Sequence, residues 1–121
     1  TADAAQACRD HDIRVMMGAP NLIRGGSHSG NVAASDLARA DLLDILSSDY
    51  VPSSLLSGAM MLGDLWGDLA RGIATVTQAP AQAVGLHDRG RLAPGARADV
   101  IRVAQISGAA AVRGLWTRTA A

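Results

Sequence analysis

Two short apolar runs, separated by a segment with helical spacing, restrict the fold of this chain most strongly. The first run, Ile13 to Met17, ends at Gly18 and is too short for a helix, so it predicts a buried strand. The second run, Leu43 to Ser48, predicts another strand, and the alanine- and leucine-rich segment Val32 to Leu43 predicts a helix between them. Two strands joined through a helix run parallel, with a right-handed crossover. The sequence therefore predicts an α/β fold.

The rest of the chain divides into a helical part and a strand-rich part. Glycines interrupt the long apolar stretch after the second strand, so two or three helical pieces are expected there. We expect helices at 2–9, within 52–77 and at 80–84, and two antiparallel strands at 99–103 and 112–117, joined by a loop around Ser107 and Gly108. The expected units are residues 1–85 and residues 86–121.

Composition excludes several classes of function. Eleven basic side chains, all arginines, balance eleven acidic ones, and the chain has two tryptophans, one tyrosine and no phenylalanine. Nucleic-acid binding is therefore not expected. The single cysteine, Cys8, excludes an intrachain disulfide and agrees with a cytoplasmic location. No apolar run approaches the roughly 20 residues of a membrane span, and no export signal precedes the first helix.

The segment Gly18 to Asn31 combines glycines, hydrogen-bond donors and an arginine directly behind the first strand. Glycines free the backbone to turn its N–H groups inward, and a guanidinium binds phosphate or carboxylate oxygens in a bidentate way. The predicted ligand, an anion with phosphate or carboxylate oxygens, would contact six side chains: Asn21, Arg24, Ser27, His28, Ser29 and Asn31. An ordinary surface loop with a solvated His28 is the alternative.

Asp49 ends the second predicted strand and is the best candidate for a catalytic group. The carboxyl ends of parallel strands meet at one edge, so we expect Asp49 beside the Gly18 segment. A carboxylate there can bind a divalent cation and accept a proton from water. The alternatives are a helix N-cap and an ion-pair partner for Arg24.

Three groups of residues carry a resemblance to a known superfamily. The strand and Gly-Ala-Pro-Asn turn at 15–21, the segment Thr77 to Leu86 and the segment Gly90 to Val100 resemble the carboxyl-terminal third of amidohydrolase-superfamily proteins. The resemblance implies the last two strands and helices of a metal-dependent-hydrolase (β/α)₈ barrel, with 86–121 forming part of a small flanking β domain. The resemblance also implies that Asp49 is the metal-binding and proton-accepting aspartate.

Three narrower motifs resemble the diphosphatases of phosphonate metabolism: Val15 to Asn21, Arg24 to Asn31 and Asp44 to Pro52. The resemblance implies a hydrolase that removes pyrophosphate from ribose 1-methylphosphonate 5-triphosphate, with the six loop residues near the triphosphate. An intact enzyme of this kind would hold a divalent metal, zinc or manganese.

The superfamily's other metal ligands, including a His-x-His pair, have no counterpart in this sequence. We therefore expect that the isolated chain binds no catalytic metal tightly and is inactive, because such sites need three or more ligands. Its expected partner is the amino-terminal barrel segment or a second copy of the chain. Two other functions stay open: an amidohydrolase acting on a cyclic amide, and a non-catalytic anion-binding or oligomerisation module.

Overall fold

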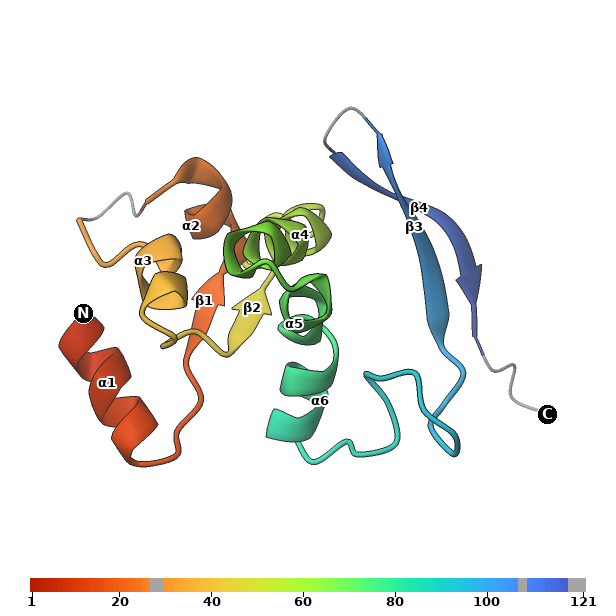
Figure 1. Cartoon of the computed structure of the whole chain (residues 1–121), viewed down its shortest axis with the longest axis horizontal. Coiled ribbons are helices and arrows are strands. Elements are labelled where there is room, and N and C mark those ends of the chain that lie inside the picture. Colours follow the sequence, from red (N-terminus) through yellow and green to blue (C-terminus); the bar gives the residue numbers. More distant parts are fainter. Residues whose placement is uncertain (27–29, 107–108, 118–121) are drawn as a thin grey trace.

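The computed structural model describes residues 1–26, 30–106 and 109–117 (Figure 1). Helices and strands mix along the chain, and the strands form two small sheets, which confirms the α/β prediction at that level. The elements are α1 (Ala2–Asp10), β1 (Met16–Gly18), α2 (Ala19–Arg24), α3 (Ala34–Arg39), β2 (Ile45–Ser47), α4 (Ser54–Trp66), α5 (Leu69–Ala74), α6 (Gln78–Ala83), β3 (Val100–Ile106) and β4 (Ala109–Trp116).

The first sheet is the predicted parallel pair. β1 and β2 lie side by side with Met16 opposite Ile45 and Gly18 opposite Ser47. Each strand has only three residues, fewer than its apolar run. Both strands end at the same edge, so the residues that follow Gly18 and Ser47 leave the sheet together.

The segment after β1 was predicted to be a loop, and this is wrong for its first half. Residues Ala19–Arg24 form α2, with Pro20 in the first turn and Leu22 buried in the core. Proline suits the first turn because its missing N–H is not needed there, and Gly25, with φ of 77°, ends the helix in the left-handed conformation. The sequence contains both signals, but the prediction of a loop followed the polar composition of the segment instead.

The glycines of the helical part were expected to interrupt its helices, and this is wrong for some of them. Gly67 ends α4 with φ of 63°, whereas Gly63 lies inside α4 and Gly72 inside α5. A Cβ added to Gly72 would lie 2.3 Å from the Ala59 carbonyl oxygen, so α5 packs directly on the backbone of α4. Two of the three glycines thus permit close helix contact rather than a break.

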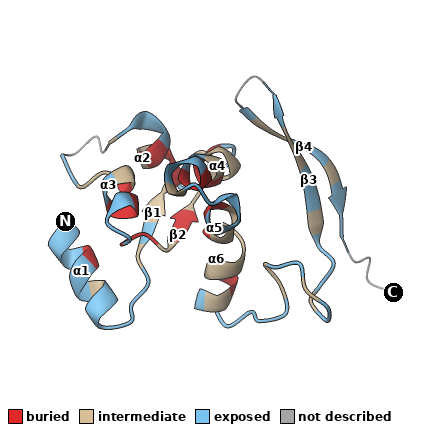
Figure 2. Cartoon of the chain, viewed as in Figure 1, coloured by how far each residue is buried: buried red, intermediate tan, exposed pale blue. Residues whose placement is uncertain are grey.

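The hydrophobic core lies where α2, α3 and α4 meet the parallel pair (Figure 2). Leu37 of α3 and Leu62 of α4 are its largest fully buried side chains, and four further leucines and four alanines complete the buried cluster. Gly58 brings α4 against the sheet, because a Cβ there would lie 3.2 Å from Leu46 Cδ1. Among the described residues, no helix combines the length and the apolar character that a membrane crossing requires.

The second sheet is an antiparallel hairpin of β3 and β4, which confirms the predicted antiparallel pairing (Figure 1). Its strands are longer than predicted, and an irregularity between Arg102 and Val103 shifts their register. The expected loop at Ser107 and Gly108 lies outside the described residues. β4 contacts α4, but much of the hairpin surface is exposed.

Candidate functional site at the carboxyl edge of the parallel pair

Asp49 lies two residues beyond β2, and its carboxylate lies against the end of β1. A Cβ added to Gly18 would be 3.0 Å from Asp49 Oδ2. Gly18 has φ of −72° and ψ of 130°, which any residue adopts, so the glycine is needed here for space. Asp49 itself has φ of 51°, a left-handed conformation that is uncommon for residues other than glycine. The expected meeting of Asp49 with the Gly18 segment is therefore present.

The alternative that Asp49 is a helix N-cap is wrong. Helix α4 begins at Ser54 and has Ser53 as its N-cap, so Asp49 is not a helix cap. The side chain is exposed to solvent at the strand edge. A water molecule or a ligand can therefore reach this carboxylate.

Arg24 and Tyr50, the residue that follows Asp49, are in contact although they are far apart in the sequence. Arg24 Nη2 donates a hydrogen bond to the Tyr50 hydroxyl oxygen, and the guanidinium carbon lies 5.6 Å from the centroid of the tyrosine ring. Arg24 Nε also donates to the Pro20 carbonyl oxygen, at 3.3 Å. Sequence reasoning selected Arg24 and missed Tyr50; its position directly after Asp49 was the available signal.

Asn21 has a structural contact that the sequence did not suggest. Its Oδ1 accepts a hydrogen bond of 2.9 Å from the backbone N–H of Ala34, the first residue of α3. The N-cap of α3 is Ala33, whose side chain cannot accept this bond. Asn21 therefore caps a helix thirteen residues further along the chain.

The other predicted ligand residues divide into one that is described and three that are not. Asn31 is exposed and precedes α3. Ser27, His28 and Ser29 lie outside the described residues. The described residues at this edge thus include Arg24, Asp49 and Tyr50.

The described residues do not form a metal centre of the kind that the superfamily resemblance implies. Over residues 1–26, 30–106 and 109–117, no group of three or more histidine, cysteine or carboxylate side chains could hold a metal ion. A catalytic zinc site uses three protein ligands and a water. Asp49 alone does not meet that requirement.

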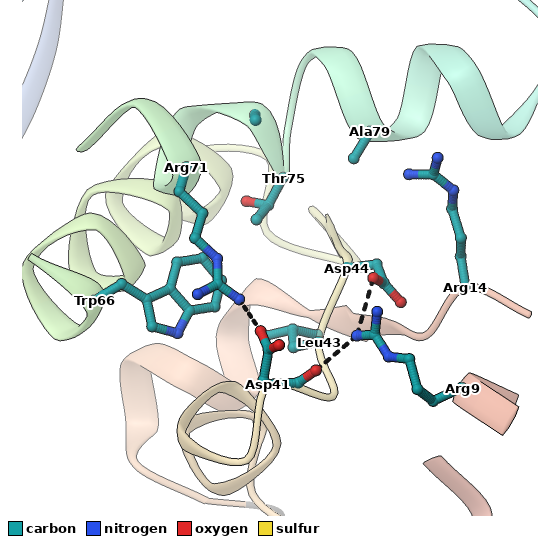
Figure 3. Close-up of a pocket in the computed structure, with 10 residues that line it drawn as sticks. Arg9, Arg14, Asp41, Leu43, Asp44, Trp66, Arg71, Thr75 and Ala79 are labelled. Carbon is teal, nitrogen blue, oxygen red and sulfur yellow. Dashed lines mark hydrogen bonds and ion pairs between the residues drawn. The ribbon is translucent and has the colours of Figure 1, made fainter. Parts of the chain in front are cut away.

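A second polar cluster lines a cavity of about 170 Å³ at the opposite end of the strands (Figure 3). Asp44 lies just before β2, and its two carboxylate oxygens bind different elements. Oδ2 accepts the N–H of Val15 at 2.8 Å, and Oδ1 lies 3.3 Å from Arg9 Nη2 of α1. Asp44 therefore joins α1 to the start of both strands.

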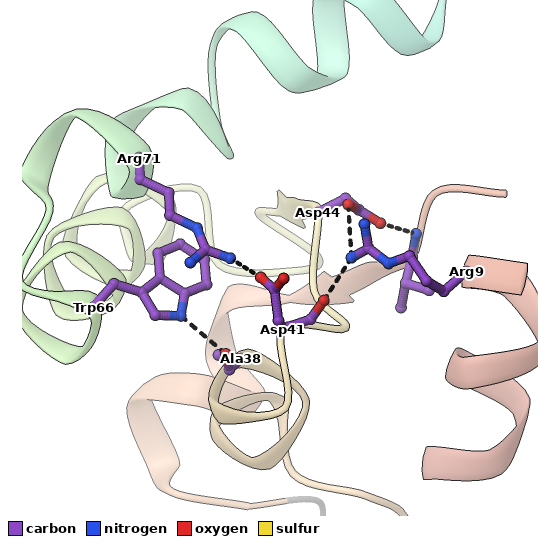
Figure 4. Close-up of polar contacts among 7 residues, drawn as sticks. Arg9, Ala38, Asp41, Asp44, Trp66 and Arg71 are labelled. Carbon is purple, nitrogen blue, oxygen red and sulfur yellow. Dashed lines mark hydrogen bonds and ion pairs between the residues drawn. The ribbon is translucent and has the colours of Figure 1, made fainter. Parts of the chain in front are cut away.

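The same cluster continues to α5 through Asp41 and Trp66 (Figure 4). Arg71 forms an ion pair with Asp41 and lies over the indole of Trp66, 3.9 Å from its centroid. Trp66 Nε1 donates to the Ala38 carbonyl oxygen at 2.9 Å. Arg9 and Arg71 pair with protein carboxylates, and Arg14 donates to the Gln82 side-chain oxygen at 3.3 Å. This cluster therefore connects elements and does not resemble a ligand site.

A lowered pKa occurs away from both clusters. The hydrogen bond of 2.8 Å that Arg89 donates to Asp88 lowers the pKa of the Asp88 carboxyl below its ordinary value. These two residues lie in the exposed turns before the hairpin. Because structural ion pairs shift pKa values in the same way, this shift does not mark a reactive group.

The parallel pair, with its polar carboxyl edge, is compatible with part of a larger α/β hydrolase. Over 104 residues, the chain is 54% identical to the alpha-D-ribose 1-methylphosphonate 5-triphosphate diphosphatase of Escherichia coli (strain K12). The match covers 84% of this chain and 28% of that protein, so the similarity is to one segment of a longer enzyme. It confirms the resemblance to this kind of diphosphatase. No protein-family profile matches the chain, and no solved structure matches it.

Proposed function

We propose that this chain forms part of the catalytic face of a diphosphatase that releases pyrophosphate from ribose 1-methylphosphonate 5-triphosphate. The observation that carries the proposal is the 54% identity over 104 residues to an enzyme of that name. The arrangement of Asp49 and Arg24 at the carboxyl edge of a parallel pair supports it, because α/β enzymes collect their reactive groups at that edge.

Each residue at this edge has a proposed role. Asp49 accepts the proton of the water that attacks phosphorus, because its exposed carboxylate is the acidic group on the edge. Arg24 binds phosphate oxygens through its guanidinium. Asn31, Ser27, His28 and Ser29 remain proposed phosphate contacts. For Asn21, the helix cap accounts for the amide oxygen, and only its NH₂ group is proposed to reach the substrate.

The arrangement of the whole enzyme is also a proposal. The parallel pair would be the last two strands of a (β/α)₈ barrel within residues 1–85, and the hairpin would belong to a small β domain within 86–121. The other strands, and the ligands that complete a zinc or manganese site with Asp49, would come from an amino-terminal segment. This chain alone is then expected to release no pyrophosphate. A cytoplasmic location stays a prediction.

A chimera tests the proposed function. In it, the matching segment of the Escherichia coli diphosphatase is replaced by the corresponding 104 residues of this chain. We expect the purified chimera to release pyrophosphate from the triphosphate substrate. Asp49→Asn in the chimera should lower kcat by about 10²–10⁴-fold, because the variant cannot accept the proton.

Asp64→Asn is the matched control, since Asp64 is an exposed carboxylate on α4 and its loss should leave kcat unchanged. Circular dichroism shows whether each chimera is folded. A folded chimera that releases no pyrophosphate, or an Asp49→Asn chimera with full activity, would contradict the proposal.

A further inference from the structure

Tyr50 is an exposed aromatic residue at the candidate site, and none of the roles proposed above belongs to it. It lies in the turn between β2 and α4, and 65% of its surface is accessible to solvent. A tyrosine this exposed stabilises the core little. Its described polar contact is the hydrogen bond from Arg24, which reaches it from the last turn of α2.

The Arg24–Tyr50 contact leaves the phenol able to bind a second group. The tyrosine oxygen accepts an N–H from the guanidinium, so its own O–H proton can be donated elsewhere. The guanidinium lies over the ring as well, with its carbon 5.6 Å from the centroid. The ring and the hydroxyl together restrict the positions that the guanidinium can occupy, whereas an arginine surrounded only by water is not restricted in this way.

The position of this pair relative to Asp49 indicates the kind of ligand. Consecutive Cα atoms are about 3.8 Å apart, so Tyr50 is held one residue from the candidate base. A guanidinium N–H and a phenol O–H both donate, and phosphate oxygens accept from both. A chain of phosphoryl groups can thus contact the pair while its reacting phosphorus lies at the strand edge.

We propose that Tyr50 and Arg24 form one oligophosphate-binding pair, in which Tyr50 positions the guanidinium and donates its own hydrogen bond to a phosphate oxygen. The proposal rests on the function proposed above and extends it to a residue outside the segment Gly18 to Asn31. Tyr50 thereby contributes to selecting substrates that carry more than one phosphate group.

The single tyrosine of the chain makes a direct measurement possible. With ¹³C-labelled tyrosine, the ring signals in an NMR spectrum of the whole chain report on Tyr50 alone. The probe is inorganic tripolyphosphate, titrated without divalent cations, with orthophosphate as the comparison. We expect a saturable shift of the tyrosine signals, with tighter binding of tripolyphosphate than of orthophosphate, and weaker binding at higher salt.

Substitutions of the two residues separate the pair from a general charge effect. Calorimetry should show that Arg24→Ala weakens tripolyphosphate binding about tenfold and that Tyr50→Phe weakens it about threefold to fivefold, within the usual net range for loss of a solvent-exposed hydrogen bond. The double variant should bind more weakly than Arg24→Ala alone, but by less than the product of the two single effects, since part of the contribution of Tyr50 acts through Arg24. Arg102→Ala removes the same charge from β3 and should leave binding unchanged.

The outcomes distinguish the inference from the proposed function. If Arg24→Ala weakens binding and Tyr50→Phe does not, the role of Tyr50 is wrong and the role of Arg24 stands. If Arg102→Ala weakens binding as much as Arg24→Ala, the association is nonspecific and the pair is wrong. If the unmodified chain does not bind tripolyphosphate, the inference is also wrong, and the proposed function is then judged by the chimera alone.

Discussion

Glycine positions in this chain meet different physical requirements. Gly67 needs a positive φ, Gly18 leaves space for the Asp49 carboxylate, and Gly72 allows two helix backbones to touch. Sequence can suggest the first, because a glycine after an apolar helix commonly ends it. The other two depend on residues distant in the chain, so the sequence did not distinguish them.

Gly72→Ala should destabilise the fold strongly. The new Cβ would lie 2.3 Å from the Ala59 carbonyl oxygen, and backbone cannot move aside as a side chain can. We expect a loss of at least about 2 kcal/mol in the free energy of unfolding, even though alanine favours helices. Urea denaturation followed by tryptophan fluorescence measures this.

Gly26→Ala is the control for that substitution, because no heavy atom of the described residues, apart from its chain neighbours, lies within 4 Å of the new Cβ. A change of no more than about 0.5 kcal/mol is expected there. Equal stabilities for the two variants would show that α5 does not pack on α4 in this way.

At the scale of elements, α3 depends on a residue from α2. The Asn21 amide oxygen accepts the Ala34 N–H, whereas Ser35 and Asp36, whose side chains could cap a helix, follow this position inside the helix. Helices lacking a local cap can be capped by any acceptor that the fold brings close. This contact could not be derived from the spacing of residues alone.

Asn21→Ala should therefore lower stability by about 1 kcal/mol, the usual cost of losing an N-cap. Thermal and urea unfolding of the chain measure the change. Asn31→Ala serves as the control, because Asn31 is exposed and its removal should have little effect. If Asn21→Ala leaves stability unchanged and weakens tripolyphosphate binding instead, Asn21 is a ligand residue and not a cap.

Two turns of the same design lead into the two parallel strands. Asp12 after α1 and Asp41 after α3 have φ of 56° and 60°. The next residue in each case donates its N–H back to the helix, Ile13 to Cys8 and Leu42 to Leu37, both at 2.8 Å. Aspartate tolerates the left-handed conformation, so neither turn required the glycine that usually signals such a helix end.

At the scale of the whole molecule, the hairpin carries large apolar side chains that the rest of the described chain does not cover. Ile101 and Leu115 are opposite each other in β3 and β4 and are 47% and 66% exposed. The parallel sheet has only two strands in the described part. Both features favour association with further strands, from a longer polypeptide or from another copy.

The isolated chain should therefore self-associate. Size-exclusion chromatography with light scattering should give a mass that rises with concentration. Replacing Ile101 and Leu115 together by lysine should lower it, because charges on the hairpin oppose the burial of its apolar face. Leu92→Lys, at a residue 84% exposed outside the hairpin, should leave the mass unchanged. A monomer at every concentration would contradict this prediction.

The sequence by itself determined the elements whose signals are local. Apolar runs such as Leu43 to Ser48 fixed the strands and their parallel order, and the residues after them indicated the polar edge with Arg24 and Asp49. The tertiary structure decided which side chains meet: Tyr50 with Arg24, Asn21 with α3, and the backbones of α4 and α5 at Gly72. Local propensity follows from neighbouring residues, whereas these contacts depend on packing between segments distant in the chain.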